Sequence, residues 1–217
     1  MRLIYCYDAY CTWCYGFNEI MKKLDATIGT KIPIEVLSGG MLIADQPINL
    51  ELIAPIIKEN YPIVESTTGV KFGSDFLWHI NNTELSDWFP SSMQPAIALC
   101  IIKELKPAIS VAFATDMEYG LYYEGRDLTD LEAYRHLLER YEIDEVAFYD
   151  KFFDPIYEDV AKNDFALVRQ LGIDSYPVLL LQISEDRFYM VAKGYTPYDT
   201  IIERINQINN EIKSALN

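Results

Sequence analysis

Two cysteines separated by two residues, Cys11 and Cys14, stand where a short apolar segment gives way to a helical pattern. The apolar segment, residues 2–7, is rich in aliphatic and aromatic side chains, which predicts a short buried strand. From Phe17 onward, apolar residues recur at spacings of three and four, which predicts a helix that ends near Gly29. The sequence therefore places a Cys-x-x-Cys motif after a strand and at the opening of a helix.

A second strand is predicted directly after this helix. Residues 32–37 have a strand pattern, and Ser38, Gly39 and Gly40 end it. A strand, a helix and a strand in succession form a βαβ unit, which implies parallel strands joined by a right-handed crossover. A Cys-x-x-Cys motif near such a unit is typical of thioredoxin-like redox proteins, so the context makes the motif informative.

The rest of the chain divides into a helical stretch and a return to strands. Between residues 41 and 159 strand patterns are absent, and strand patterns come back at 177–183 and 187–192 before a final helix. The predicted fold class is α/β with the order βαβ…ββα, a core of residues 1–40 and 160–217, and an inserted all-helical domain of residues 41–159. The helices predicted between the two strand regions cover 49–59, 92–105, 107–123, a segment from Thr129, 144–153 and 154–171.

Helix geometry indicates what the two cysteines can do. One helical turn places Cys11 and Cys14 on the same face, close enough for a disulfide. The free N–H groups and the positive dipole end at the start of a helix favour a thiolate at Cys11. We therefore expect Cys11 to be the nucleophile and Cys14, more deeply buried, to be the resolving thiol. The redox-active Cys11–Cys14 pair would itself carry the electrons, and no bound cofactor is expected.

The cysteine pair could also be half of a metal site or a chance pairing of two core residues. A zinc site uses Cys-x-x-Cys, but the sequence has no second pair, and its two histidines, His79 and His136, lie far apart in different helical segments. No metal is therefore expected. A chance pair of buried cysteines would not be expected to fall at a strand-to-helix junction.

Residues around the motif have simpler interpretations. Trp13 could anchor the helix against the core, but we favour an exposed aromatic rim beside the reactive thiol, because the nucleophile must be accessible. Asp8 is interpreted as a turn residue. Cys6 and Cys100 lie in apolar patterns and are expected to be buried in the core.

Composition excludes several classes of partner. The chain has 217 residues, with 33 acidic against 18 basic side chains and a formal net charge of −15 at pH 7. A surface this acidic repels phosphate backbones and anionic lipid, so neither nucleic acid nor membrane is expected as a partner. Asp8 stops the first apolar run well short of the roughly 7–15 residues that a secretory signal needs. We therefore expect a cytoplasmic protein, without a structural disulfide framework.

Five segments of the chain have a familiar pattern: Asp8-Ala9-Tyr10-Cys11-Thr12-Trp13-Cys14-Tyr15-Gly16-Phe17, Ser38-Gly39-Gly40, residues 123–128, residues 172–177 and Gly194-Tyr195. Together they resemble the DsbA-like thiol–disulfide oxidoreductases, and specifically their FrnE-like cytoplasmic branch. The resemblance implies a thioredoxin-like fold with a large all-helical insertion, and thiol–disulfide exchange as the activity.

The resemblance also assigns a role to the loop before the third strand. It implies a cis peptide bond between Tyr176 and Pro177, in a loop that faces Cys11, and a Tyr176 backbone free to pair with an extended substrate segment. Without the resemblance, Pro177 would only be expected to open a strand. Trp13, Tyr176 and Pro177 are therefore the predicted substrate-binding residues.

The leading hypothesis is a protein disulfide reductase or isomerase that acts on protein thiols and disulfides and is served by a cellular thiol reductant. Thr12 and Trp13 add no positive charge beside Cys11, so we expect a less oxidising couple than that of strongly oxidising periplasmic members. One alternative is a DsbA-like cytosolic adaptor that binds partners through its helical insert. A weaker one is a kappa-type glutathione transferase or related isomerase, which uses a serine in place of paired cysteines. The oligomeric state does not follow from the sequence.

Overall fold

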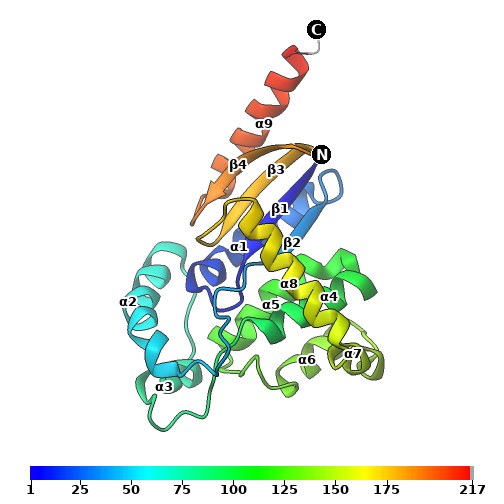
Figure 1. The fold of residues 1–217 in the computed structure, drawn as a ribbon. Coiled ribbons are helices and arrows are strands. Elements are labelled where there is room, and N and C mark those ends of the chain that lie inside the picture. The colour runs from blue at the N-terminus through cyan, green and yellow to red at the C-terminus, as the bar shows by residue number, and fades with distance from the viewer. Residues whose placement is uncertain (216–217) are drawn as a thin grey trace.

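Four strands form one mixed sheet in the computed structural model, which describes residues 1–215 (Figure 1). Strand β1 (Arg2–Tyr7) pairs in parallel with β2 (Ile34–Ser38). Its other edge pairs antiparallel with β3 (Val178–Ser184), which pairs antiparallel with β4 (Arg187–Lys193). The strand order β2-β1-β3-β4 contains both kinds of pairing, so the predicted mixed sheet is confirmed.

Helices account for most of the remaining described residues. The parallel pairing of β1 with β2 requires a crossover, which the first helix supplies. Asn49, Asp144 and Asp154 cap three of the helices with their side chains. The helices are α1 (Thr12–Ile28), α2 (Leu50–Thr68), α3 (Ser74–Asn81), α4 (Met93–Leu105), α5 (Ser110–Tyr122), α6 (Glu132–Arg140), α7 (Glu145–Phe152), α8 (Pro155–Gln170) and α9 (Tyr198–Ala215), with a short 3₁₀ turn η1 (Pro107–Ile109) before α5.

Two differences from the predicted helices have local causes. Helix α2 continues past residue 59 to Thr68, where Gly69 ends it with a φ of 83°, a conformation that favours glycine. Helix α3 was not predicted. It has eight residues, no capping side chain at its start, and only Phe76 and Ile80 buried, so its apolar pattern is too short to recognise.

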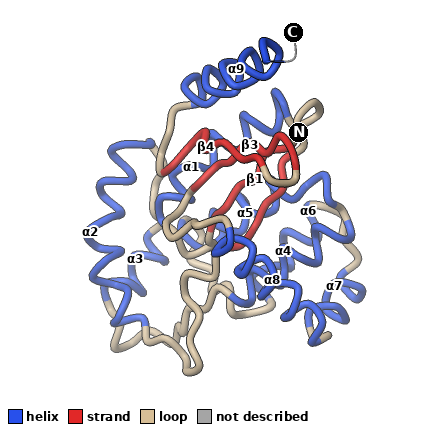
Figure 2. Tube along the Cα trace, turned by 45° about the horizontal axis from the view of Figure 1, so that its top comes forward, coloured by secondary structure: helices blue, strands red, loops and turns tan. Residues whose placement is uncertain are grey.

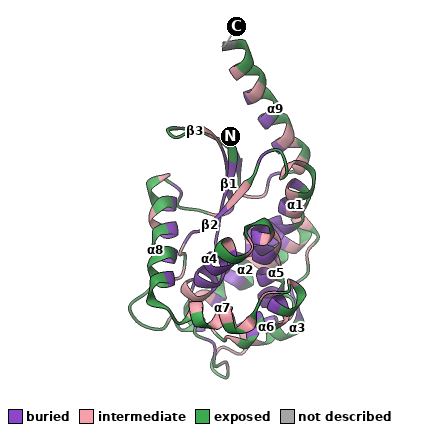
Figure 3. Ribbon diagram, turned by 90° about the vertical axis from the view of Figure 1, so that its right-hand side faces the viewer, coloured by how far each residue is buried: buried purple, intermediate pink, exposed green. Residues whose placement is uncertain are grey.

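The sheet lies between two layers of helices (Figure 3). Tyr5 and Tyr7 of β1 belong to the core that α1, α5 and α9 share. Ile4 and Cys6, which alternate with them, belong to a smaller core completed by Val168 of α8. This alternation is the two-residue period of a strand buried on both faces. Both faces of β1 are therefore covered by helices.

Helices of the segment between β2 and β3 pack directly on the strand-bearing part of the chain (Figure 2). Helix α5 packs against α1, and α4 packs against α8, so one continuous apolar core joins the sheet to the helices. The predicted division between residues 159 and 160 falls inside α8, which runs unbroken from Pro155 to Gln170. The division into a core and an inserted domain stays a prediction.

A buried carboxylate connects three separate segments at the end of β1. Asp8 is 1% exposed, and it accepts hydrogen bonds from Tyr10 N at 3.0 Å, Met41 N at 2.7 Å and Ser92 Oγ at 2.9 Å. Ser92 also accepts from Leu42 N at 2.9 Å. Asp8 is thus a turn residue, as predicted, and in addition it joins the loop before α1, the segment after β2 and the start of α4.

We predict that Ser92→Ala lowers the free energy of unfolding by about 1–3 kcal/mol, because it leaves Asp8 with one fewer donor and the Leu42 amide without its acceptor. Denaturant unfolding measures the change. Ser66→Ala is the control, since Ser66 is exposed and donates only to a carbonyl of its own helix; about 0.5 kcal/mol or less is expected there. Equal losses in the two variants would contradict the proposed joining role of Ser92.

Candidate active site at the start of helix α1

Cys11 caps the N-terminus of α1. Its backbone is extended, with φ −91° and ψ 108°, and its Sγ accepts a hydrogen bond from Cys14 N at 3.4 Å. Asp8 holds the preceding turn through a 2.9 Å bond from Cys11 N to its carbonyl oxygen. The sulfur therefore lies where free N–H groups and the positive end of the helix dipole favour a negative charge.

The loop before β3 lies against Cys11, although the two are distant in sequence. Cys11 Sγ donates to the carbonyl oxygen of Tyr176 at 3.5 Å, and the Tyr176–Pro177 peptide bond is cis, the geometry that the resemblance implies. The Tyr176 hydroxyl donates to the carbonyl oxygen of Gly39 at 3.1 Å. A Cβ at Gly39 would overlap the Tyr176 ring, so only glycine permits this approach. The pairing of β1 with β3 brings the two loops together.

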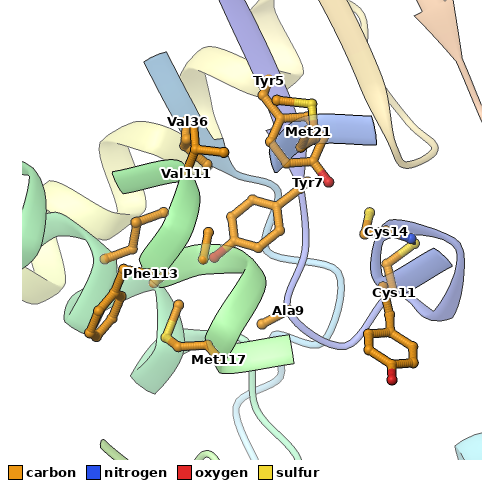
Figure 4. Close-up of a cluster of buried hydrophobic side chains, with 14 of the residues drawn as sticks. Tyr5, Tyr7, Ala9, Cys11, Cys14, Met21, Val36, Val111, Phe113 and Met117 are labelled. Atoms are coloured by element: carbon orange, nitrogen blue, oxygen red, sulfur yellow. The ribbon is translucent and has the colours of Figure 1, made fainter. Parts of the chain in front are cut away.

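Cys14 is more deeply buried than Cys11, as predicted: its exposed fraction is 0%, against 8% for Cys11. Both are unbonded thiols in this structure, and they lie side by side at the start of α1 (Figure 4). Burial raises the pKa of the Cys14 thiol well above its ordinary value, and its hydrogen bond and charge interaction with Cys11 act in the same direction. Cys14 is thus held as a neutral thiol beneath Cys11.

A cavity of about 400 Å³ opens beside Cys11. Residues of helix α2 form one wall of it, and Trp13 and Tyr176 also line it. Trp13 is half-buried, so it both contacts the core and borders the cavity. None of the described residues that line the cavity is Lys, Arg or His, and Asp174 contributes a carboxylate. Its apolar lining includes Trp13, Met41, Leu42, Ile53, Ile56 and Ile57.

The other two cysteines are buried away from this cavity, as predicted. Burial raises the pKa of both Cys6 and Cys100 to about 12, and the nearby Asp164 carboxylate adds to the effect. Asp164 is itself paired with Lys103 at 2.6 Å. Thiols held neutral in this way are poor nucleophiles. Neither Cys6 nor Cys100 borders the cavity beside Cys11, so neither is a candidate for the attacking thiol.

Sequence reasoning missed one ionisable group near the pair, Glu118 of α5. Its exposed fraction is 0%, and neither carboxylate oxygen has a hydrogen-bond partner among the described residues. Burial is the main cause that raises its pKa well above the ordinary value, and repulsion from Cys11 is the next. One signal was available: Glu118 is an acid among apolar residues at helical spacing, with Ala114, Met117 and Leu121 around it.

Comparison with known proteins places this arrangement in a recognised architecture. No family model matches the chain, and no curated protein matches it. Several solved structures match the chain. A presumed protein disulfide isomerase from Nitrosomonas europaea has a TM-score of 0.83 at 20% identity, covering 96% of this chain and 97% of its own. The cytosolic disulfide reductase DsbM from Pseudomonas aeruginosa has a TM-score of 0.78 at 20% identity, covering 96% and 99%. The chain has a DsbA-like thioredoxin fold.

The same fold also occurs with other chemistry. A 2-hydroxychromene-2-carboxylate isomerase matches with a TM-score of 0.64 at 12% identity and covers 100% of this chain and 98% of its own. Fold alone therefore does not decide the reaction, and the side chains at the start of α1 must do so. Within residues 1–215, no three His, Cys, Asp or Glu side chains gather in a way that could hold a metal ion. No helix in that range is long and apolar enough to span a membrane.

We predict a pH-dependent effect of Glu118→Gln on stability. Because the pKa of Glu118 is higher in the folded chain than its unfolded value of about 4.3, unfolding releases a proton between the two values, and the wild-type protein loses stability as pH rises. Glutamine cannot titrate. The unfolding free energy of the variant, minus that of the wild type, should therefore grow above about pH 4.3, by at most ~1.4 kcal/mol per pH unit.

Urea unfolding at several pH values between 4 and 8 measures this difference. Glu19→Gln is the matched control, because it makes the same chemical change at an exposed position on α1. A constant difference for Glu118→Gln would mean that the Glu118 carboxyl titrates as it does in the unfolded chain.

Proposed function

We propose that the protein is a thiol–disulfide oxidoreductase of the protein disulfide reductase or isomerase type. The Cys11 thiolate attacks a substrate disulfide, forms a mixed disulfide with one substrate sulfur and releases the other as a thiolate. Cys14 then attacks Cys11 Sγ, which forms the Cys11–Cys14 disulfide and releases the second substrate thiolate. Two electrons pass from the cysteine pair to the substrate, and a cellular thiol reductant returns the pair to its dithiol form.

The observation that carries this proposal is the position of Cys11 Sγ. It lies at the helix N-terminus, borders the cavity, and is 3.5 Å from the Tyr176 carbonyl oxygen, while Cys14 lies directly behind it. An attacking thiolate needs electrostatic support and access to a substrate sulfur, and this position offers both. The neighbouring backbone of Tyr176 is the edge on which an extended substrate segment would pair.

The direction of electron flow follows from the charges around the pair. The helix N-terminus favours the Cys11 thiolate, but no Lys, Arg or His among the described residues borders the cavity, and repulsion between Cys11 and the buried Glu118 carboxyl opposes negative charge nearby. A less stabilised thiolate makes the dithiol form less favourable and the pair less oxidising. Reduction or isomerisation of substrate disulfides therefore fits the site better than oxidation. The similar cytosolic protein DsbM is a disulfide reductase, which supports the same direction and a cytoplasmic location.

The cavity wall indicates a protein substrate. Leu52, Ile56 and Ile63 of α2 are 71%, 62% and 49% exposed, and Ile56 also borders the cavity. Apolar side chains exposed beside a reactive thiol favour an apolar polypeptide segment around the substrate cysteine. The reductant that restores the dithiol is proposed to be a small cellular thiol; a structure of DsbM with glutathione shows that the neighbour takes such a ligand.

The exposed face of α2 is also what favours the adaptor alternative, since it could hold a partner without any chemistry. A double variant with Cys11→Ser and Cys14→Ser distinguishes the two, because an adaptor keeps its biological role without the thiols and an oxidoreductase loses it. The isomerase alternative has a structural neighbour, but the complete cysteine pair at the start of α1 argues against it here.

We predict that Cys14→Ser accumulates covalent adducts with cell proteins. Without Cys14, the mixed disulfide on Cys11 is not resolved, so adducts should appear on non-reducing gels and disappear on addition of dithiothreitol. Cys11→Ser should give none, because Cys14 is fully buried. Cys100→Ser, a buried cysteine outside the site, is the control and should behave as the wild type. If Cys14→Ser forms no adducts, the proposed exchange mechanism is wrong.

We predict that Ile56→Glu selectively impairs turnover of protein disulfides. The charge on the cavity wall should lower kcat/KM for a disulfide in an apolar protein segment by about tenfold, equivalent to ~1.4 kcal/mol. Reduction of a small disulfide such as hydroxyethyl disulfide should change by less than about twofold, because it does not reach the α2 wall. Val146→Glu on α7 is the matched control, since Val146 is also exposed but does not border the cavity. An equal loss on both substrates would argue against α2 as a substrate-binding wall.

A further inference from the structure

The cavity beside Cys11 has an uncompensated negative charge at its edge. Among the described residues that line it, Asp174 is the only Asp, Glu, Lys, Arg or His. Asp174 is exposed, and Ser175 Oγ donates to its Oδ1 at 3.3 Å. A hydroxyl carries no charge, so no described residue of the lining neutralises the carboxylate. A ligand in this cavity therefore meets a negative charge and no positive one.

The loop that holds Cys11 also places Asp174 near the reacting sulfur. Asp174 stands two residues before Tyr176, whose carbonyl oxygen accepts from Cys11 Sγ at 3.5 Å. Ile173, on the other side of Asp174, is buried in the smaller core with Val168 of α8. The chain is thus anchored on both sides of the carboxylate. Two residues span at most about 7 Å of backbone, so a long side chain close to the substrate cysteine can reach it.

The indole of Trp13 is a second group in this cavity that favours a cation. Trp13 is half-buried and lines the same cavity as Asp174. The face of an indole attracts a Lys or Arg side chain more strongly than that of any other aromatic residue. Within residues 1–215 the rings that have such a cation over them belong to tyrosines, for example Tyr198 with Lys23 Nζ at 3.9 Å. No cation of the described chain therefore occupies the Trp13 face.

The α2 wall adds a hydrogen-bond acceptor to this part of the molecule. Asn60 lines the cavity, and its Nδ2 donates to Ile56 O at 2.8 Å. The amide therefore directs a hydrogen at its own helix and keeps Oδ1 as an acceptor. A cationic side chain, which carries only donors, meets here a carboxylate, an amide oxygen and an aromatic face beside an apolar wall.

We propose that Asp174 and Trp13 make the protein select substrate disulfides that have an arginine or lysine within two residues of the attacked cysteine. This inference rests on the function proposed above, and it adds a charge to the apolar substrate segment. Arginine fits best, because its planar guanidinium pairs with a carboxylate through two parallel hydrogen bonds and stacks on aromatic rings. A glutamate at the same position meets the Asp174 carboxylate and is rejected by repulsion.

The overall charge of the protein is a rival cause of the same preference. A chain with a net charge of −15 attracts any cationic peptide, wherever its acids lie. Asp186, in the turn between β3 and β4, is the matched control. It is exposed, it accepts from Ser184 Oγ at 2.9 Å, and it does not line the cavity. Asp186→Asn removes the same charge as Asp174→Asn, so only the place of the charge differs.

Stopped-flow reaction of the dithiol protein with peptides that carry thionitrobenzoate on their single cysteine tests the proposal. The Cys11 thiolate attacks the peptide sulfur, a Cys11–peptide disulfide forms, and coloured thionitrobenzoate leaves as a thiolate. Three peptides share one apolar sequence and have Arg, Gln or Glu at both positions two residues from the cysteine. Each rate constant is divided by that of the same peptide with dithiothreitol, which cancels the effect of the neighbours on the disulfide itself.

In the wild-type protein we expect the Arg peptide to react about tenfold faster than the Glu peptide, with the Gln peptide between them. Asp174→Asn should reduce this ratio by about threefold or more, and Asp174→Lys should invert it. Asp186→Asn should change the ratio by less than about 1.5-fold, because exposed charges far from the cavity are screened. Trp13→Leu should lower it by about twofold. A ratio between peptides is insensitive to any change in Cys11 reactivity, since that change affects all three alike.

Equal rates for the three peptides with the wild-type protein overturn the proposal. Equal losses in Asp174→Asn and Asp186→Asn also overturn it, because the preference then comes from the overall charge. If none of the three peptides releases thionitrobenzoate, the proposed thiol–disulfide exchange is itself wrong. Failure of the inference is therefore distinguished from failure of the function.

Discussion

The Asp8 carboxylate is the interaction on which the site depends. It accepts from the Tyr10 amide before α1, from the Met41 amide after β2 and from the Ser92 hydroxyl at the start of α4. Burial raises the pKa of Asp8, while these donors lower it, so its charge is tolerated only because three segments supply hydrogen atoms to it. The same contacts fix the turn that ends at Cys11, and with it the direction from which Cys11 meets the helix N-terminus. The position of the reactive sulfur is therefore set by contacts that extend from the sheet into the helical segment.

The helical segment builds the site as much as the strands do. The strands and their loops supply the cysteine pair and the Tyr176 loop, but α2 forms the apolar wall beside Cys11, and α5, which packs on α1, carries the buried Glu118. Each contribution needs a dry, packed interface, because an apolar wall binds only where water is displaced and a carboxyl shifts its pKa only where it is desolvated. One core that runs without interruption from the sheet to the helices meets that condition. The two parts of the chain thus both contribute to the surroundings of the same pair of sulfurs.

The sequence predicts those features of the fold that depend on local residue patterns. Apolar spacing and the two cysteines were enough to place β1, α1 and a mixed sheet, because these features depend on neighbours within a few residues. The same reasoning could not place Glu118 near the cysteine pair, because only folding packs α5 on α1, which is about a hundred residues away in sequence. It could not find the α2 wall either, because in the sequence Ile56 is one apolar residue among many, and only the folded structure places it beside the cavity. The turn at Asp8 was predicted, but its link to Ser92 was not, because hydrogen bonds between distant loops leave no periodic signal.

The net charge of −15 matters through where the charges lie rather than through their number. Surface carboxylates are screened within about 10 Å at moderate ionic strength, so they bear little on a thiol inside the protein. Buried carboxyls are not screened, and Asp8 and Glu118 are both buried beside the cysteine pair while no basic side chain of the described residues borders the cavity. The helix N-terminus is then the main favourable field at Cys11, and repulsion from the buried Glu118 opposes it. The proposed reduction of substrate disulfides therefore rests on the electrostatics next to the pair and not on the overall acidity of the chain, because a pair without nearby cations is less oxidising.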